Sequence, residues 1–370
     1  MKLTFFILSG LILMTFLPGI TLASDCTETV ADLSIANVYS DIDNCDITIR
    51  SSEEVEDMTL EVQLEHRGKN LQKKIFKIAA VSANSDAIKA FQWNTDNKDD
   101  GKFIVKSKLL KDGCEVDSDT YSFVNGRQVI PRITVDDFVP NSEGFSVMAT
   151  PQEAVLVDVE YMLLDGSDVI FSDSLEKIAL HTQPFEISRN WNTLLTNGKQ
   201  YSGRVKIKMY SPSENYIVAM KDFTAKDDVF ISDIYKDEIG ASATIDGISQ
   251  VPFTGSVRFT VTQETDNGND IVESTTRKSP ILLNGDDETV EVIWKRRLPE
   301  GIYKLFIEII GNDGDILDVK ETIIEAESAS TSLIATGETG TADEESPGFL
   351  SIHAVLMVVA SIFVYRRTKK

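Results

Sequence analysis

The chain contains few of the side chains that most often carry out chemistry in proteins. Its three histidines are His66, His181 and His353, and none has a second histidine or a cysteine at the spacing of a metal-binding motif. Neither HExxH nor CxxC occurs, so we do not expect a zinc site. The nucleophile elbow GxSxG and glycine-rich phosphate loops are also absent. The sequence therefore predicts no catalytic residues, no metal and no cofactor.

Three acidic turns offer oxygen ligands of the kind that Ca²⁺ prefers. They are residues 96–100, 266–270 and 312–315, with the sequences DNKDD, DNGND and NDGD. None has the twelve-residue spacing of a calcium loop with its closing glutamate. Because Asp, Asn and Gly are also the residues that tight turns require, we expect turns here rather than metal sites.

The charge balance excludes one large class of partner. The formal net charge is -23, and several of the few basic residues lie at the extreme ends of the chain, at Lys2 and within 366–370. The body between the ends is therefore more acidic still, and it offers no basic stripe for phosphate. We do not expect binding to nucleic acid.

The first 23 residues have the features of a secretory signal peptide. One lysine precedes an apolar run from Leu3 to Leu17, and a Pro-Gly break is followed by the small residues Thr21 and Ala23. We expect cleavage after Ala23. The alternative is an uncleaved N-terminal anchor, and either one exports the body to an oxidising environment where disulfides persist.

An internal repeat is marked by three tryptophans about 100 residues apart, Trp93, Trp191 and Trp294. Each is followed by a glycine and then by an aromatic residue that opens an alternating strand, and the segments that begin at residues 32, 132 and 229 are alike as well. One tryptophan at the same place in each repeat predicts a shared core role, packed on the aromatic residue eight to ten positions later. The alternative is an exposed platform on which sugars stack.

Strand signals fill each repeat. Alternation of apolar and polar residues, as in LEVQL at 60–64 and RVKIK at 204–208, is interrupted by Gly, Asn and Asp turns, and long helical periodicity is absent. About 100 residues with roughly seven strands are typical of an antiparallel β-sandwich of the immunoglobulin or fibronectin type. The layout resembles the adhesion-related sandwich modules of archaeal and bacterial surface proteins. We therefore expect an all-β body of three tandem sandwiches.

The expected organisation of the whole chain follows from these signals. It comprises a signal peptide at 1–23, β-sandwiches at 25–130, 131–228 and 229–327, a Ser/Thr-rich acidic linker at 328–346, and a C-terminal segment at 347–370 with an apolar transmembrane helix and a basic tail.

Three cysteines, Cys26, Cys45 and Cys114, allow at most one intrachain disulfide. In a sandwich of this type, the segment before the first strand lies at the same end as the turn between the last two strands. Cys26 and Cys114 fall at those two places, whereas Cys45 opens the second strand at the other end. We predict a bridge between Cys26 and Cys114.

The C-terminal segment has enough apolar length to hold a membrane. The 18 residues from Gly348 to Tyr365 would form a helix about 27 Å long, against a hydrocarbon core of about 30 Å. The basic tail would stay in the cytoplasm, which leaves the body outside.

The tripeptide Pro347, Gly348 and Phe349 stands between the acidic linker and this helix. The order of linker, tripeptide, helix and basic end resembles the PGF-type C-terminal sorting signal of archaeal surface proteins. The resemblance implies that an archaeosortase, a membrane protease-transpeptidase, recognises the tripeptide, removes the helix and leaves the protein attached to a lipid. The alternative is a single-span anchor that is kept.

Together these features predict a non-enzymatic archaeal protein of the outer face of the cytoplasmic membrane. Its expected role is that of a spacer, an adhesion module or a structural part of the envelope, in contact with other envelope proteins. The alternative is an extracellular module that binds a sugar, a peptide or calcium through its loops.

Overall fold

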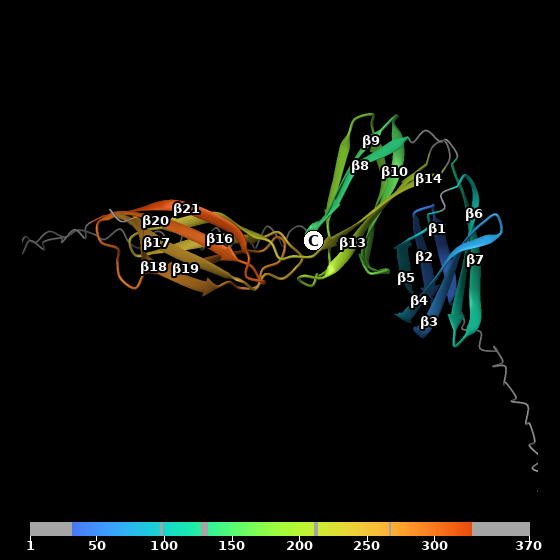
Figure 1. The fold of residues 1–370 in the computed structure, drawn as a ribbon, viewed down its shortest axis with the longest axis horizontal. Helices are drawn as coiled ribbons and strands as arrows, with labels where there is room; N and C mark the ends of the chain where they lie inside the picture. The colour runs from blue at the N-terminus through green and yellow to red at the C-terminus, as the bar shows by residue number, and fades with distance from the viewer. Residues whose placement is uncertain (1–31, 97–98, 127–131, 211–213, 266–267, 328–370) are drawn as a thin grey trace, which may run out of the picture. The chain divides into compact units, whose positions relative to one another are not determined.

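The structure is a computed structural model that describes residues 32–96, 99–126, 132–210, 214–265 and 268–327. Within these ranges the regular structure consists of 21 strands paired antiparallel (Figure 1), which confirms the all-β class. All of them belong to a unit that ends at Ala326. The expected signal peptide, the linker at 328–346 and the helix within 347–370 lie outside the described residues. Among the described residues, no helix has the length and apolar character needed to cross a membrane.

The strands follow the sequence repeats in three groups of seven, here called the first, second and third sandwich. The first contains β1 (Ser34–Ser40), β2 (Asn44–Ser51), β3 (Val55–His66), β4 (Lys69–Val81), β5 (Ser85–Gln92), β6 (Gly101–Lys111) and β7 (Cys114–Asn125). The second contains β8 (Ile133–Pro140), β9 (Gly144–Pro151), β10 (Val155–Asp165), β11 (Asp168–Leu180), β12 (Phe185–Asn190), β13 (Gln200–Met209) and β14 (Asn215–Thr224). The third contains β15 (Val229–Lys236), β16 (Gly240–Gly247), β17 (Ser256–Thr265), β18 (Gly268–Lys278), β19 (Asp287–Ile293), β20 (Gly301–Ile310) and β21 (Ile316–Ala326).

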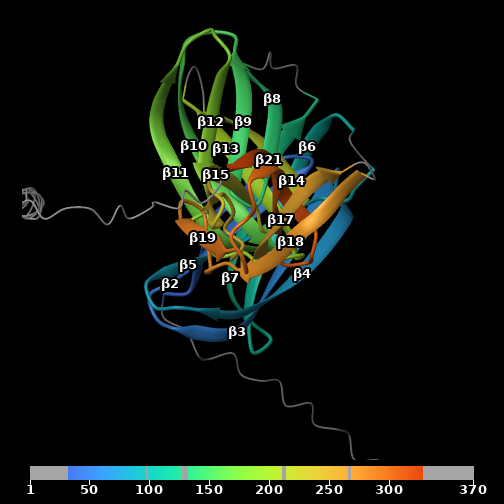
Figure 2. The same ribbon diagram turned by 90° about the vertical axis from the view of Figure 1, so that its left-hand side faces the viewer.

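The same pairing pattern recurs in each group, whose strands are labelled in Figures 1 and 2. The first, second and fifth strands form one sheet, and the fourth, third, sixth and seventh strands form the other in that order. The sequence predicted a sandwich of the immunoglobulin or the fibronectin type. The observed pairing differs from that of the constant-type immunoglobulin domain, in which the fourth strand joins the sheet of the first, second and fifth strands. The cause is the hairpin between the third and fourth strands, such as the one that pairs His66 with Lys69.

Each sandwich has its own buried cluster between its two sheets. The alternation read from the sequence places these side chains, because successive residues of a strand point to opposite faces. In β20, for example, Tyr303, Leu305 and Ile307 are buried in the third cluster. In β13 the outward-facing residues Arg204 and Lys206 are buried too. The outer face of β13 is therefore covered by another part of the molecule.

The three tryptophans lie in the three clusters, one in each. Each indole Nε1 donates a hydrogen bond to the turn between the first two strands of its sandwich: Trp93 to Ser40 Oγ at 2.9 Å, Trp191 to the Asn141 carbonyl at 2.9 Å, and Trp294 to the Asp237 carbonyl at 3.2 Å. Buried indole groups need such partners. The tryptophan of each repeat therefore connects the core of its sandwich to this turn through a hydrogen bond, here called the clasp.

The predicted ring contact across the following glycine is not found in any of the three sandwiches among the described residues. In the first sandwich, Trp93 contacts the ring of Phe91 at 5.0 Å between centroids and not that of Phe103. The second sandwich shows the rearrangement most clearly. Trp191 contacts the rings of Phe145 and Tyr161 at 5.6 and 6.4 Å between centroids. Its ring contacts among the described residues do not include Tyr201. The Tyr201 hydroxyl accepts a hydrogen bond from the backbone N–H of Thr196 at 3.2 Å, which holds the turn after the tryptophan.

The cysteines of the first sandwich differ in state. Cys45 is a buried free thiol, and its pKa is raised by burial and by the nearby Asp46 carboxylate. Cys114, at the start of β7, is disulfide-bonded. Cys26 lies outside the described residues, so its predicted bridge to Cys114 stays a prediction.

Candidate functional site

The first and second sandwiches meet along β5 and β11. Lys89 of β5 pairs with Asp168 of β11, and the Ala90 N–H donates to the Ser167 carbonyl at 3.0 Å. This pairing joins the sheet β1-β2-β5 to the sheet β11-β10-β13-β14. The Lys89 ammonium, which is buried, forms an ion pair with the Asp168 carboxylate. The two sandwiches are therefore linked by backbone and side chains.

A small apolar cluster lies at this junction, separate from the three main cores. Its buried members are Ala90, Met162 and Leu164. The partly buried residues packed against them are Ile88, Val169 and Met220. Since Met162 and Leu164 lie on β10 and Ala90 on β5, the cluster covers the outer face of the four-stranded sheet of the second sandwich.

Buried charges lie next to this cluster. Asp46 of β2 accepts hydrogen bonds from Arg204 Nη2 and, at 2.9 Å, from Lys206 Nζ, and both cations come from β13. Only 1% of the Asp46 surface and none of the Arg204 surface is exposed. The Lys206 ammonium also lies 2.8 Å from Glu160 Oε2. Removing one partner from such a group leaves an uncompensated buried charge, which typically costs about 3–5 kcal/mol.

Strand geometry explains why these side chains meet. On β13, Val205 and Ile207 point into the core of the second sandwich, so Arg204 and Lys206 point outward. On β2, Cys45 and Ile47 are in the core of the first sandwich, which turns Asp46 outward. The two outer faces then bring opposite charges together where the side chains are buried.

Two tyrosines pack at the edge of the charged group. The rings of Tyr39 and Tyr216 lie 5.0 Å apart, and the Lys206 ammonium lies 5.3 Å from the Tyr39 centroid. Burial, followed by the neighbouring Asp41 carboxylate, raises the pKa of Tyr39. Burial and the hydrogen bond to Glu214 raise the pKa of Tyr216. Both rings are therefore neutral at physiological pH and act as packing and cation–π partners.

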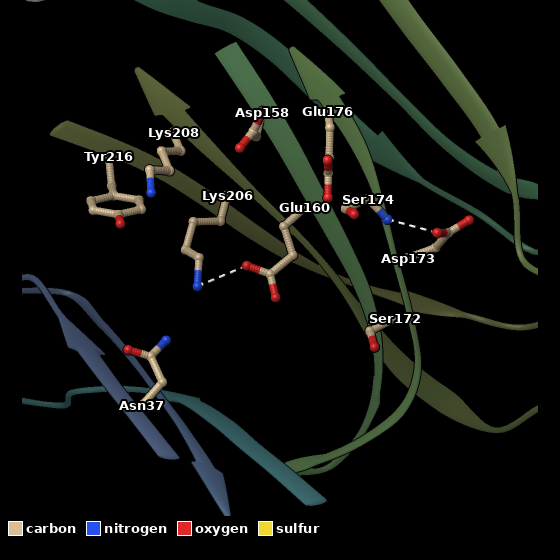
Figure 3. Close-up of a pocket in the computed structure, with 10 residues that line it drawn as sticks. All are labelled: Asn37, Asp158, Glu160, Ser172, Asp173, Ser174, Glu176, Lys206, Lys208 and Tyr216. Atoms are coloured by element: carbon tan, nitrogen blue, oxygen red, sulfur yellow. Dashed lines mark hydrogen bonds and ion pairs between the residues drawn. The ribbon is translucent and has the colours of Figure 1, made fainter. Parts of the chain in front are cut away.

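A cavity of about 530 Å³ opens beside this junction (Figure 3). Figure 3 shows the Lys206 and Glu160 side chains pointing toward each other and joined by their ion pair, with Asn37 of the first sandwich below them in this view. The cavity is lined by Asn37, Asp158, Glu160, Ser172, Asp173, Ser174, Glu176, Lys206, Lys208 and Tyr216.

Two of the cavity carboxylates, Asp158 and Asp173, are poorly suited to proton transfer at neutral pH. The Ser174 N–H and the Tyr161 hydroxyl donate to Asp173 at 2.8 and 2.9 Å and lower its pKa. Partial burial opposes the shift at Asp158, but the Tyr210 hydroxyl and the Lys177 N–H lower its pKa as well. General acid–base catalysis favours groups that titrate near the working pH. These two carboxylates stay ionised, and they fit the binding of a polar or cationic ligand better than catalysis.

The sequence-based site residues lie elsewhere. Trp93, Trp191 and Trp294 are buried and offer no platform to a ligand. Pro347, Gly348, Phe349 and Cys26 lie outside the described residues. Of the two histidines that the structure describes, His181 is exposed, whereas the buried His66 has its Nδ1 3.1 Å from the Lys102 carbonyl.

The acidic turns do not form a metal centre in the described part of the chain, where no group of three or more His, Cys, Asp or Glu side chains is arranged to hold a metal. In the turn at 312–315, Asp313 and Asp315 lie 3.5 and 3.6 Å from the Lys226 ammonium. A cation of the protein itself thus occupies the neighbourhood of these carboxylates. Residues 97–98 and 266–267 of the other two turns lie outside the described residues.

Sequence reasoning missed Asp46, Arg204 and Lys206. The alternation of RVKIK predicts a strand but does not show what covers its polar face, and cations on such a face usually contact solvent. The available signal was Asp46 between apolar residues in CDITI, together with two cations on one strand face of a chain whose net charge is -23.

Neither a protein-family model nor any curated protein matches the chain. Among solved structures, trypsin-activated alpha-2-macroglobulin from Escherichia coli matches 80% of this chain at 12% identity and a TM-score of 0.21, and this chain spans 23% of that protein. A second match is a tetra-tandem repeat in the extending region of a large adhesion protein. The alignment covers 80% of this chain and 74% of the repeat structure, at 12% identity and a TM-score of 0.24. A third match is a DUF4785 family protein from Legionella pneumophila. The alignment covers 79% of this chain and 91% of that protein, at 11% identity and a TM-score of 0.29. Likenesses of this degree assign neither an activity nor a partner to the chain.

Proposed function

We propose that this protein is a non-enzymatic module of a cell surface that serves as a spacer or adhesion element, exported and held to the membrane at its C-terminus. The observation that carries the proposal is the junction built from Asp46, Arg204 and Lys206, which buries opposite charges between two sandwiches. Bending the junction would expose or separate these charges and would uncover Met162 and Leu164. A spacer requires such a fixed connection, because it must hold its far end in a defined place.

The termini support export and anchoring. The first 23 residues resemble a signal peptide, and Pro347, Gly348 and Phe349 precede an apolar segment and a basic end. We propose that an archaeosortase-like enzyme of an archaeal membrane processes this C-terminus. Other envelope proteins are the proposed partners, and the net charge of -23 argues against nucleic acid.

Protease treatment of intact cells tests the surface location. Peptides from residues 32–326 should be released from whole cells while a cytoplasmic marker stays intact. Complete protection of these peptides until the cells are broken would overturn the proposal.

Mass spectrometry of the membrane-extracted protein tests the processing. No peptide from residues 350–370 should be present, and a lipid should be attached near the new C-terminus. An intact basic tail would leave a single-span anchor and remove the sorting proposal, whereas the surface location would stand.

A second candidate function is the binding of a polar ligand in the cavity of Figure 3, favoured by its carboxylates, its serines and Tyr216. A Ser174→Trp substitution would fill the cavity without removing a charge. If adhesion of cells to sugar-coated or peptide-coated surfaces is lost in this variant while the protein stays folded, the cavity is a binding site. Unchanged adhesion would rule this candidate out.

A further inference from the structure

The third sandwich has two connecting loops that are longer than their counterparts in the other two. Residues 248–255 join its second and third strands, and residues 279–286 join its fourth and fifth strands. The corresponding loops of the first and second sandwiches are shorter, at 52–54, 152–154, 82–84 and 181–184. Since the same fold forms without the extra residues, they serve something besides the fold. Long ordered loops are a usual place for binding functions.

The two long loops pack on one another and on the end of β16. Phe253 and Leu282, both buried in the core of the third sandwich, exchange backbone hydrogen bonds of 2.9 and 3.2 Å between the loops. The Gly247 N–H, at the end of β16, donates to the Asp286 carbonyl at 2.9 Å. A Cβ at Gly247 would lie 2.2 Å from the Leu283 carbonyl oxygen, so only glycine fits there. The second long loop is therefore held as a fixed wall beside β16.

This wall borders a cavity of about 470 Å³ on the outer face of the sheet β15-β16-β19. Phe230, Asp246 and Asp287 form one row across the three strands, because Asp246 pairs with each of the other two. Their side chains point outward, since the neighbouring Val229 and Ile245 lie in the core. The lining also includes Ser232, Asn284 and Asp286.

Phe230 gives the cavity an aromatic face. It is 40% exposed, and no other phenylalanine in the described ranges is exposed. The bulge that follows one residue later in each first strand fixes the equivalent positions, which are Ser34 and Thr134. The aromatic ring is thus a feature of the third sandwich alone, as the long loops are. The face of such a ring carries partial negative charge and attracts the C–H groups on the apolar side of a sugar ring.

The polar groups of the lining fit a ligand with many hydroxyl groups. The Ser232 hydroxyl donates to Asp246 at 2.9 Å, and the Leu283 N–H donates to Asp286 at 2.9 Å. Both carboxylates are therefore held in place, with lone pairs left for a ligand. Ionised carboxylates accept hydroxyl protons in short, charge-assisted hydrogen bonds. The Asn284 amide adds a group that both donates and accepts.

The charge of the lining selects among sugars. Asp246, Asp286 and Asp287 contribute three carboxylates, and none of the described lining residues is a lysine or an arginine. A uronate, a sialate or a sulfated sugar would be repelled. A neutral sugar supplies hydroxyl donors to these acceptors, and it also uses the aromatic ring and the amide, which a simple cation would not need.

We propose that the Phe230 cavity, formed by Phe230, Ser232, Asp246, Asn284 and Asp287, binds a neutral sugar residue of a glycan. Phe230 packs on the apolar side of the sugar ring, and Asp246 and Asp287 accept protons from its hydroxyl groups. The volume lies in the range of small-molecule sites. The inference goes beyond the proposed function, because it concerns a different cavity from that of Figure 3 and does not depend on where the protein is located.

Binding of the purified full chain to immobilised glycans tests the proposal, in a detergent whose headgroup is not a sugar. The neutral probes are mannan, galactan and a chitin oligosaccharide, heparin is the acidic probe, and polylysine is the probe for a cationic partner. We expect binding to at least one neutral glycan and none to heparin. Binding to no neutral glycan would overturn the proposal, as would binding to heparin, or to polylysine alone in a way that depends on Phe230.

Substitutions assign the binding to this cavity. Phe230→Ala should raise the dissociation constant for the neutral glycan at least about tenfold, as the truncation of a central aromatic contact does. Phe230→Trp should retain binding because an aromatic ring remains. The matched control is Tyr235→Ala, which removes an exposed aromatic residue of the same strand outside the cavity and should leave the constant unchanged.

Ser174→Trp, which fills the cavity of Figure 3, should leave glycan binding unchanged as well, and melting curves will show that every variant is folded. Undiminished binding in a folded Phe230→Ala variant would contradict the proposal. Equal losses in Phe230→Ala and Tyr235→Ala, or a loss in Ser174→Trp, would place the sugar elsewhere on the chain and contradict it too.

Discussion

The corresponding positions Lys106, Arg204 and Phe306, each three residues after the buried aromatic residue of its sixth strand, show how one sandwich fold is used in three ways. Lys106 of the first sandwich is exposed and pairs with Glu65 at 2.8 Å, as a solvent-facing lysine does. Arg204 of the second is fully buried against Asp46 of another sandwich. Phe306 of the third is an apolar residue that is only partly covered. The inward-facing residues set the fold in all three, and the outward-facing residues determine what the sheet contacts.

The exposed pair of the first sandwich and the buried group of the second also differ in their contribution to stability. An exposed pair such as Lys106 with Glu65 typically contributes about 0–1 kcal/mol, because water solvates both charges when they separate. The buried group of Asp46, Arg204 and Lys206 has no such solvent, so its members depend on one another. We infer that the junction favours one defined arrangement over others more than it adds net stability.

The largest effects are expected from the tryptophans. Replacing Trp191 or Trp294 with Ala should cost about 3–5 kcal/mol, a large share of the stability of a domain of this size. Trp294→Ala should unfold the third sandwich alone, whereas Trp191→Ala should also loosen the first, because β10 and β13 carry the junction. Hydrogen exchange of each sandwich, followed by mass spectrometry, measures both effects. Unchanged exchange and melting in both variants would contradict the core role.

The next largest effect is expected at the junction. Asp46→Ala leaves Arg204 and Lys206 buried without their shared carboxylate and should destabilise the first two sandwiches by about 3–5 kcal/mol. The matched control is Glu65→Ala, which breaks the exposed pair with Lys106 and should cost at most about 1 kcal/mol. Denaturant unfolding of both variants gives the two values. Equal costs would mean that the two faces do not differ as described.

A smaller effect distinguishes the first sandwich from the other two. Non-reducing peptide mapping should link Cys26 to Cys114, and Cys114→Ser should destabilise the first sandwich by about 2–4 kcal/mol without changing the third. The Cys45→Ala variant should leave the map unchanged because Cys45 is a free thiol. Any peptide that joins Cys45 to another cysteine would show the pairing to be wrong.

The smallest effect is a dependence on alkaline pH in the second sandwich. Burial, followed by the hydrogen bond to Asp173, raises the pKa of Tyr161 from 10.0 to about 12. The folded protein therefore keeps a proton that the unfolded chain loses, so the contribution is full below pH 10 and disappears as the pH rises toward 12. Unfolding by urea at several pH values in this window should show that the free energy of unfolding falls more steeply with pH in the natural chain than in Tyr161→Phe. Equal slopes would contradict the assignment.

The sequence predicted the architecture because the architecture depends on local patterns. Period-2 alternation, turn residues and the recurrence of Trp93, Trp191 and Trp294 are readable without knowing what lies nearby. The clasp of each indole onto the first turn was not readable in detail, because the acceptors are a serine hydroxyl in one sandwich and backbone carbonyls in the other two. Which acceptor each indole uses depends on the three-dimensional surroundings of the turn, which local sequence patterns do not reveal.

The junction could not be predicted for a related reason. A lysine or arginine on the outer face of a strand is normally solvated, and RVKIK has the same pattern whether water or another sandwich covers it. Only the approach of β2, whose Asp46 is 158 positions from Arg204 in the chain, distinguishes the two cases. The two long loops of the third sandwich differ, since the extra residues of 248–255 and 279–286 are present in the sequence itself.

The central claim is that Asp46, Arg204 and Lys206 hold the first two sandwiches in one fixed arrangement. Spin labels at two exposed positions, Ile75→Cys in the first sandwich and Met148→Cys in the second, allow a direct test by pulsed electron spin resonance, since Cys45 is buried and Cys114 is bonded. We predict a single narrow distribution of distances that becomes broad in the Asp46→Ala variant. A broad distribution in the natural chain, or a narrow one that Asp46→Ala leaves unchanged, would contradict the claim.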